Sequence, residues 1–140
     1  MTRNHQLVCD AEKGDCMRAC VTSILGIPND PSLPNCDDPE WYLKWFKFLR
    51  QFGFELRYAQ TACWRNGYWI ASVPSLNFPD GTHAIVMDGT KVAFDPSPKK
   101  RYRRGMSLTG TGKVLGGHYF EITDPDLLPA FVAYKFSRSL

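Results

Sequence analysis

The fold of this chain is decided by residues 82–96, which have the sequence THAIVMDGTKVAFDP. The Asp-Gly pair at 88–89 is a strong signal for a tight β-turn, and apolar runs lie on both sides of it. We therefore expect a β-hairpin with strands over Thr82–Asp88 and Lys91–Asp95.

The pairing of this hairpin decides which side chains meet. If Met87 pairs with Lys91, paired residue numbers sum to 178, and His83 lies opposite Asp95. Opposite residues on antiparallel strands have Cβ atoms about 4.5–5.5 Å apart. At that distance the Asp95 carboxylate can accept a hydrogen bond from the His83 imidazole.

Residues 14–26 predict a helix, because apolar residues recur there at helical spacing and Gly26 is a stop signal. Asp15 is a candidate N-cap, which would place Cys16 in the first turn. The helix macrodipole favours an anion at that end, and therefore the reactive thiolate. We expect Cys20, one turn further along, to be buried and unreactive.

A thiol needs a base to become a nucleophile, and the base needs a residue that orients it. Cys16, His83 and Asp95 could fill these three roles. Each also has an ordinary structural interpretation: a core thiol, a histidine at a strand start, and a turn before Pro96. His118 is a second candidate for the base, and the hairpin pairing makes it the second choice.

The rest of the chain predicts a second helix and further strands. Residues 29–38 are rich in Pro, Asp and Asn and predict a loop. A helix should begin near Asp38, with Pro39 at its first position, run to Phe52 and stop at Gly53. Helices followed by strands indicate an α+β fold in one domain, residues 1–140. The remaining predicted strands are Phe54–Ala59, Trp69–Val73, His118–Ile122 and Phe131–Phe136.

The composition excludes several classes to which the protein could belong. Hydrophobic residues make up 44% and aromatic residues 14%, as in a globular chain. The net charge of +3 is too small to indicate a nucleic-acid partner. No apolar stretch is long enough for a signal peptide core or a membrane span.

The cysteine pattern predicts free thiols in a cytoplasmic protein. The count is odd and no secretory segment begins the chain, so a disulfide framework is not expected. No C-x-x-C pair is present, and we expect neither a metal nor a cofactor. The five cysteines are Cys9, Cys16, Cys20, Cys36 and Cys63.

Five of the six residues in Lys99–Arg104 are basic, and the sixth is Tyr102. The simplest interpretation is a solvated loop. Because the run follows Asp95 closely, it could also lie at the rim of the cleft and steer an acidic substrate. The glycine-rich segment 108–113 lacks the spacing of a phosphate loop and predicts a mobile loop.

The motifs GDCMRAC at 14–20, THAIV at 82–86 and Asp95-Pro96 together resemble the papain-like cysteine peptidase clan. The nearest branch is the bacteriocin-leader-processing peptidases and related small proteins of bacteria and phages. Met17 stands where that branch usually has glycine. The resemblance implies a papain-like fold, in which the nucleophile helix packs on an antiparallel sheet. It also implies that Gln6 helps to form the oxyanion hole, although nine residues separate it from Cys16.

The resemblance implies a hydrolase with a Cys16–His83–Asp95 triad that acts on an amide bond of a protein or peptide. Peptidase, isopeptidase and deamidase reactions all remain open. The alternatives are an acyltransferase with the same triad and an inactive papain-like module that binds a partner protein or a nucleotide. We expect a cytoplasmic location, in the host if the chain is phage-encoded, and neither nucleic acid nor membrane as a partner.

Overall fold

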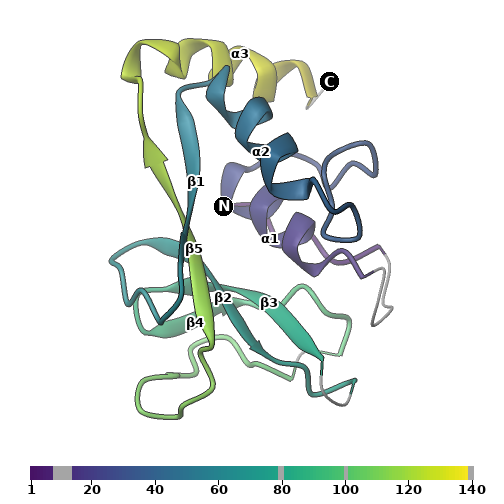
Figure 1. The fold of residues 1–140 in the computed structure, drawn as a ribbon, viewed down its shortest axis with the longest axis vertical. Helices are drawn as coiled ribbons and strands as arrows, with labels where there is room; N and C mark the ends of the chain where they lie inside the picture. The colour runs from purple at the N-terminus through teal and green to yellow at the C-terminus, as the bar shows by residue number, and fades with distance from the viewer. Residues whose placement is uncertain (8–13, 79–80, 100, 139–140) are drawn as a thin grey trace.

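The computed structural model describes residues 1–7, 14–78, 81–99 and 101–138, so Cys9 and Lys100 lie outside the described residues. Three α-helices and one antiparallel sheet of five strands confirm the α+β class within these ranges (Figure 1). No helix among the described residues has both the length and the apolar character needed to cross a membrane. The helices are α1 (Cys16–Leu25), α2 (Trp41–Arg50) and α3 (Leu128–Arg138). The strands are β1 (Phe54–Ala59), β2 (Tyr68–Pro74), β3 (Thr82–Asp88), β4 (Lys91–Phe94) and β5 (Gly116–Ile122), in the sheet order β1-β5-β2-β3-β4.

Helix α1 forms where the apolar periodicity predicted it. It ends at Gly26, whose φ of 71° lies in the left-handed region. There the Gly26 N–H donates to the carbonyl of Ser23 (3.2 Å). Cys16 is the first residue of the helix, as expected, and Cys20 is fully buried. The helix thus presents one cysteine at its end and hides the other in the core.

Helix α2 begins later than predicted. Residues 36–40 form turns instead, and the Asp38 carboxylate accepts a hydrogen bond from the Glu40 N–H (2.9 Å). This local bond offers the backbone an alternative to the helix, so Pro39 lies outside α2. The helix ends at Arg50, two residues before the predicted end, and its Trp45 and Leu49 are fully buried in the core.

The predicted strand Phe131–Phe136 is wrong, because these residues belong to helix α3. The Asp124 side chain accepts a hydrogen bond from the Asp126 N–H (3.1 Å), and Pro125 begins a short 3-10 helix, Pro125–Leu127, that leads into α3. Phe131 and Tyr134 are three residues apart and both pack on Phe52, with ring centroids 5.5 and 5.1 Å away. Periodicity alone does not distinguish a strand from a helix in such a nearly continuous apolar run, FVAYKF.

The pairing predicted for the β3–β4 hairpin is also wrong. Lys91 pairs with Asp88 rather than Met87, because residues 89–90 make the turn and Gly89 has φ 59°. A bulge between Val86 and Met87 then shifts the register, so that Val86 pairs with Phe94. Strand β4 ends there, one residue before the predicted end.

The sheet separates two layers of core side chains. Ile70 and Val86 pack with the helices, whereas their neighbours Ala71 and Met87 belong to the second cluster. Alternate residues of a strand point to opposite faces, so the two clusters lie on opposite sides of the sheet. Helices α1 and α2 lie beside one face in Figure 1. The second cluster also includes Tyr102 and Leu108 from the segment after β4.

Candidate active site

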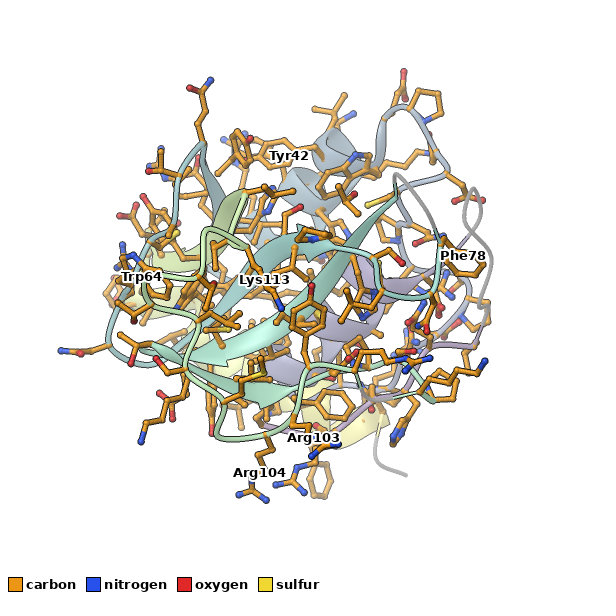
Figure 2. The ribbon with its side chains drawn as sticks, turned by 90° about the horizontal axis from the view of Figure 1, so that it is seen from below. Tyr42, Trp64, Phe78, Arg103, Arg104 and Lys113 are labelled. Atoms are coloured by element: carbon orange, nitrogen blue, oxygen red, sulfur yellow. The ribbon has the colours of Figure 1, made fainter. Side chains whose placement is uncertain are left out.

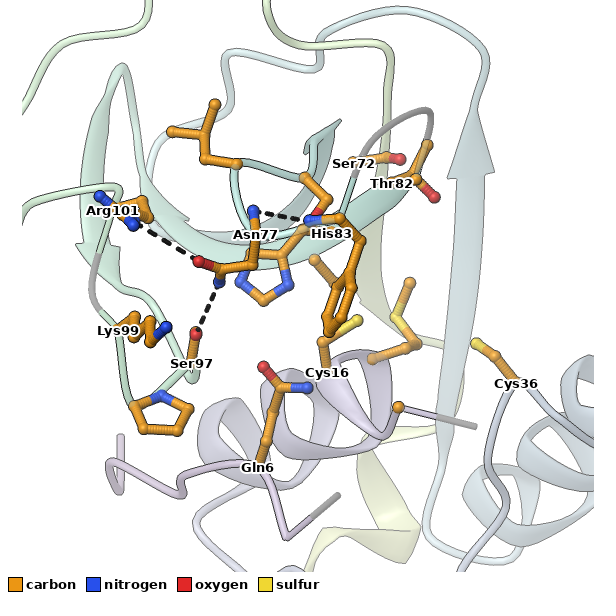
Figure 3. A pocket seen from close by; sticks show the side chains of 18 residues that line it. Gln6, Cys16, Cys36, Ser72, Asn77, Thr82, His83, Ser97, Lys99 and Arg101 are labelled. Carbon is orange, nitrogen blue, oxygen red and sulfur yellow. Dashed lines mark hydrogen bonds between the residues drawn. The ribbon is translucent and has the colours of Figure 1, made fainter. Parts of the chain in front are cut away.

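A pocket of about 530 Å³ opens at the start of α1. Gln6, Cys16 and His83 line it (Figure 3). Asp95 contacts His83 from a buried position. Three distant parts of the chain therefore meet at one place: the N-terminal segment, the first turn of α1, and the β3–β4 region. The structure brings all four predicted site residues together.

Cys16 owes its place to the helix that it begins. The first backbone hydrogen bond of α1 runs from the Ala19 N–H to the Asp15 carbonyl (2.9 Å). The N–H groups of residues 16–18 precede that bond and lie at the positive end of the helix macrodipole. Cys16 itself is partly exposed, and its side chain points from the helix toward His83 in Figure 3. The sulfur is therefore accessible and close to a base.

The contact between His83 and Asp95 forms despite the altered register. With Val86 opposite Phe94, the next residue of the second strand falls beside Ile85, which shares a face with His83. The His83 Nε2 and the Asp95 Oδ1 then lie 2.7 Å apart across a diagonal. The predicted contact was correct although the predicted pairing was not.

Backbone donors hold the Asp95 carboxylate in this position. The Ser97 N–H donates to Oδ1 (2.9 Å), and the Tyr102 N–H donates to Oδ2 (3.2 Å). Asp95 is only 2% exposed. Because Asp95 occupies His83 Nε2, the other ring nitrogen, Nδ1, is the one available to the Cys16 thiol.

The surroundings of His83 favour its protonated form. Burial works against the imidazolium, but hydrogen bonds to Asp95 and to Cys16, together with their negative charges, outweigh burial and raise the pKa of His83 to about 9. An imidazolium is therefore the main form at neutral pH when a thiolate is beside it. That arrangement stores the proton that an acyl-transfer reaction must later deliver.

Asp15 has a role that the sequence did not reveal. Its side chain makes no N-cap hydrogen bond. Instead the buried carboxylate accepts hydrogen bonds from the Leu7 N–H (3.0 Å) and from the Asn29 amide (3.0 Å), and it pairs with Arg18 (3.0 Å). Asp15 thus ties the N-terminal segment, which carries Gln6, to the start of α1. The available signal in the sequence was the spacing of Asp15 and Arg18, which are three residues apart and can therefore pair on a helix.

Gln6 reaches the pocket through two attachments of its own segment. Its backbone N–H donates to the carbonyl of Pro96 (2.9 Å), directly after Asp95. The next residue, Leu7, is bound by Asp15. Figure 3 shows the Gln6 amide pointing toward Cys16. A donor in this position could face the oxygen of a carbonyl under attack.

His118, the rival base, is not among the described residues that line the pocket. It is 8% exposed and surrounded by the rings of Trp41, Tyr42 and Tyr58, whose centroids lie 5.9, 6.4 and 5.0 Å away. Burial lowers its pKa to about 4, so it is neutral at physiological pH. His118 is part of the aromatic packing between α2 and the sheet.

The other described cysteines are free but differ from Cys16. Burial raises the pKa of Cys20 well above its usual value. Cys36 lies across the pocket from Cys16 at its edge, and partial desolvation, with the charges of Cys16 and Asp37, raises its pKa to about 12. Burial also raises the pKa of Cys63, although Arg65 opposes the shift. None of these three environments favours a thiolate.

The basic run divides into residues with different roles. Tyr102 is 1% exposed, and its hydroxyl donates to the carbonyl of Pro74 (2.6 Å), so it anchors the segment in the core. Lys99 and Arg101 line the pocket, as expected for a rim, whereas Arg103 and Arg104 are exposed away from it. Nothing in the local sequence indicated that the aromatic residue among the charges would be buried.

Comparisons with protein-family models, with curated proteins and with solved structures found no match to this chain. Within the described residues, no three His, Cys, Asp or Glu side chains gather in a way that could hold a metal ion. The functional argument therefore rests on the geometry and chemistry of the pocket.

Proposed function

We propose that this chain is a cysteine-dependent hydrolase of papain-like architecture, with Cys16 as nucleophile, His83 as general base and acid, and Asp95 as the residue that orients His83. The substrate would be an amide or isopeptide bond in a protein or peptide. The contact that carries the proposal is the 2.7 Å hydrogen bond between His83 Nε2 and Asp95, because it directs Nδ1 toward the pocket that Cys16 lines.

The first half of the reaction forms a thioester. Cys16 transfers its proton to His83 Nδ1, and the thiolate attacks the carbonyl carbon of the substrate. As the tetrahedral intermediate collapses, the carbon–nitrogen bond breaks and His83 gives its proton to the leaving amine. Asp95 stabilises the imidazolium throughout and remains ionised.

The second half releases the acyl group. His83 takes a proton from water, and the resulting hydroxide attacks the thioester carbon. The carbon–sulfur bond then breaks, and the Cys16 thiolate is restored beside the protonated His83. In both halves the carbonyl oxygen becomes negative, and the Gln6 amide and the N–H groups at the start of α1 are suitable donors to it.

The papain-like assignment and the location belong to the same proposal. A helix that begins with the nucleophile and packs on an antiparallel sheet bearing the base and its partner supports that architecture. Free thiols persist in the cytoplasm, where glutathione and thioredoxin keep them reduced, and we place the activity there.

Acylation of Cys16 by an activated ester tests the proposal directly. With p-nitrophenyl acetate, we expect a burst of about one nitrophenolate per protein, followed by slower turnover. Mass spectrometry should find a single acetyl group on the peptide that contains Cys16. Cys16→Ala should abolish the burst, and His83→Ala should slow it by about 100-fold or more.

The same experiment separates the alternatives. An acetyl-Cys16 that water releases slowly but that added hydroxylamine or a peptide amine releases quickly would favour the acyltransferase. A chain that shows no burst, or a burst that survives Cys16→Ala, would not be a hydrolase of this kind. Cys36→Ala is the matched control, since Cys36 lines the same pocket and should not affect the burst.

A further inference from the structure

We propose that the pocket contains a carboxylate-binding subsite, formed by Lys99, Arg101 and Asn77, that selects peptide substrates with an acidic side chain near the bond to be cleaved. The inference rests on the proposed function of Cys16 and extends it to substrate choice. Lys99, Arg101 and Asn77 all line the pocket that Cys16 and His83 line.

The charged side chains that line the pocket are basic. Among the described residues that line it, Lys99 and Arg101 are cationic, and none is an aspartate or glutamate. The ion pairs found among the described residues involve other basic groups: Arg18, Lys44, Arg57 and His83. The positive charges of Lys99 and Arg101 therefore face the pocket without a carboxylate partner in the described structure. A carboxylate from a substrate would supply one.

Asn77 is held in a defined orientation between these groups. Its side-chain NH₂ donates to the Ser97 hydroxyl (3.3 Å), and its carbonyl oxygen accepts from the Arg101 Nε (3.4 Å) (Figure 3). The Arg101 bond orients the guanidinium, whose terminal nitrogens remain for a ligand. Segments that follow β2 and β4 are thus joined at this wall by two hydrogen bonds of the Asn77 amide.

Local hydrogen bonds also join the described residues on either side of Asn77. The Ser75 hydroxyl accepts from the N–H of Phe78 (3.0 Å), and the Ser75 N–H donates to the carbonyl of Gly81 (2.9 Å). The wall is therefore built before any ligand arrives, which lowers the entropic cost of binding.

The remaining lining favours a peptide over a free phosphate. Leu76 and Phe78 are 48% and 36% exposed at this pocket, and Met17 lies in its lining as well. Apolar side chains beside a cationic wall fit a chain with both an acidic group and a hydrocarbon part. Inorganic phosphate could use only the cationic wall.

The test compares two small electrophiles that differ in charge. Iodoacetate carries a carboxylate and iodoacetamide does not, and both alkylate a thiolate. The quantity measured is the ratio of their rate constants at Cys16, because a ratio cancels changes in the reactivity of the sulfur itself. We expect Lys99→Gln/Arg101→Gln to lower this ratio by about fivefold. The matched control is Arg103→Gln/Arg104→Gln, which removes the same charge from exposed positions that Figure 2 shows at an edge of the molecule away from Phe78.

A second arm uses acetylated tripeptide vinyl sulfones with Glu, Gln or Lys next to the reactive group. We expect the Glu probe to label Cys16 fastest and to lose its advantage in the Lys99/Arg101 variant. A ratio that is unchanged in that variant, or that falls equally in the control, would overturn the proposal. A competition experiment offers a further contradiction. It would be contradictory if inorganic phosphate slowed the labelling of Cys16 but an unreactive acetylated tripeptide amide that contains Glu did not. Failure of the catalytic proposal would look different, because Cys16 would then be slow with iodoacetamide as well.

Discussion

His83 uses Nε2 to bind a buried carboxylate and turns its other nitrogen toward a thiol. Each partner is fixed by a different kind of interaction. Backbone N–H groups hold Asp95, and the helix places Cys16. The histidine is therefore positioned by contacts that do not depend on a substrate, which is the condition for efficient proton transfer.

The pKa of His83 should depend on Cys16. The hydrogen bond and the charge of the Cys16 thiolate both raise this pKa, so Cys16→Ala should lower it below about 9. NMR titration of the imidazole C–H protons measures the change. Cys36→Ala is the control, because Cys36 lines the same pocket, whereas the interactions that raise the pKa of His83 come from Asp95 and Cys16. An equal fall in both variants would contradict this account.

Replacing Asp15 with asparagine should be costly. The substitution leaves Arg18 with no carboxylate partner in a position where it is 5% exposed, and an unpaired buried charge costs about 3 kcal/mol. Urea unfolding would measure the loss, and the loosened Gln6 segment should slow acylation of Cys16 as well. Asp38→Asn, which breaks the exposed pair with Lys44, should have a much smaller effect. Equal losses in the two variants would show that Asp15 does not tie the segment.

At the residue scale, the sequence predicted that Cys16, His83 and Asp95 would meet, but it did not predict all the contacts that hold the site together. Helical spacing was enough to place Cys16 at a helix start, and the turn signal was enough to bring His83 near Asp95. The role of Asp15 depends on its contact with Leu7 and Asn29, which no local pattern contains. The burial of Tyr102 likewise depends on Pro74, 28 residues away.

At the scale of elements, β3 carries His83, Asp95 directly follows β4, and α1 begins with Cys16, the proposed nucleophile. The bulge in the β3–β4 pairing is important here, because the extra residue, Ala93 of β4, changes which residue of β4 lies opposite each residue of β3. Side-chain alternation keeps His83 and Asp95 on one face after this shift. A shift of one residue would have placed them on opposite faces.

Gly53 joins α2 to β1 at a point where no side chain fits. Its φ is 78°, and a Cβ added there would lie 2.1 Å from the carbonyl oxygen of Asp124. We expect Gly53→Ala to lower the free energy of unfolding by about 3 kcal/mol, because backbone must move as well as adopt a strained φ.

The control for this prediction is Gly67→Ala. Gly67 has φ 87°, but nothing lies within 4 Å of an added Cβ. Its cost should be only that of the left-handed conformation, about 1 kcal/mol. Urea denaturation of both variants measures the difference. Equal costs would show that the close approach to Asp124 is not a constraint.

Predictions of elements succeeded where one pattern dominated and failed where two competed. Strands β1 and β3 have the predicted bounds, because turn residues flank clear extended runs. Residues 131–136, FVAYKF, form a nearly continuous apolar run that suits a strand or a helix, and the contacts of Phe131 and Tyr134 with Phe52 show helical spacing. The hairpin register failed because a bulge leaves no reliable trace in one sequence.

The whole molecule has a sheet with cores on both faces and the pocket at the junction of helix and sheet. Cys20 is in the core cluster between the helices and the sheet, one turn below Cys16. The site is therefore built on the most buried part of the fold. Loss of packing between α1 and β3 should dismantle it.

Cys20 provides a probe of this cooperativity. In a variant in which Cys20 is the only cysteine, labelling by a disulfide reagent should require global unfolding, because the side chain is fully buried. The free energy obtained from the labelling rate should equal that from urea denaturation to within about 0.5 kcal/mol. Much faster labelling would show that α1 opens separately from the sheet.

The most direct test of the central claim is the rate at which iodoacetamide alkylates each cysteine at pH 7. Mass spectrometry of the cysteine-containing peptides measures this rate for each site. We predict that Cys16 reacts at least about tenfold faster than Cys36 and Cys63, and that His83→Ala removes most of this advantage. A Cys16 that reacts no faster than the other two, or whose rate is the same in the His83→Ala variant, would contradict the proposed active site.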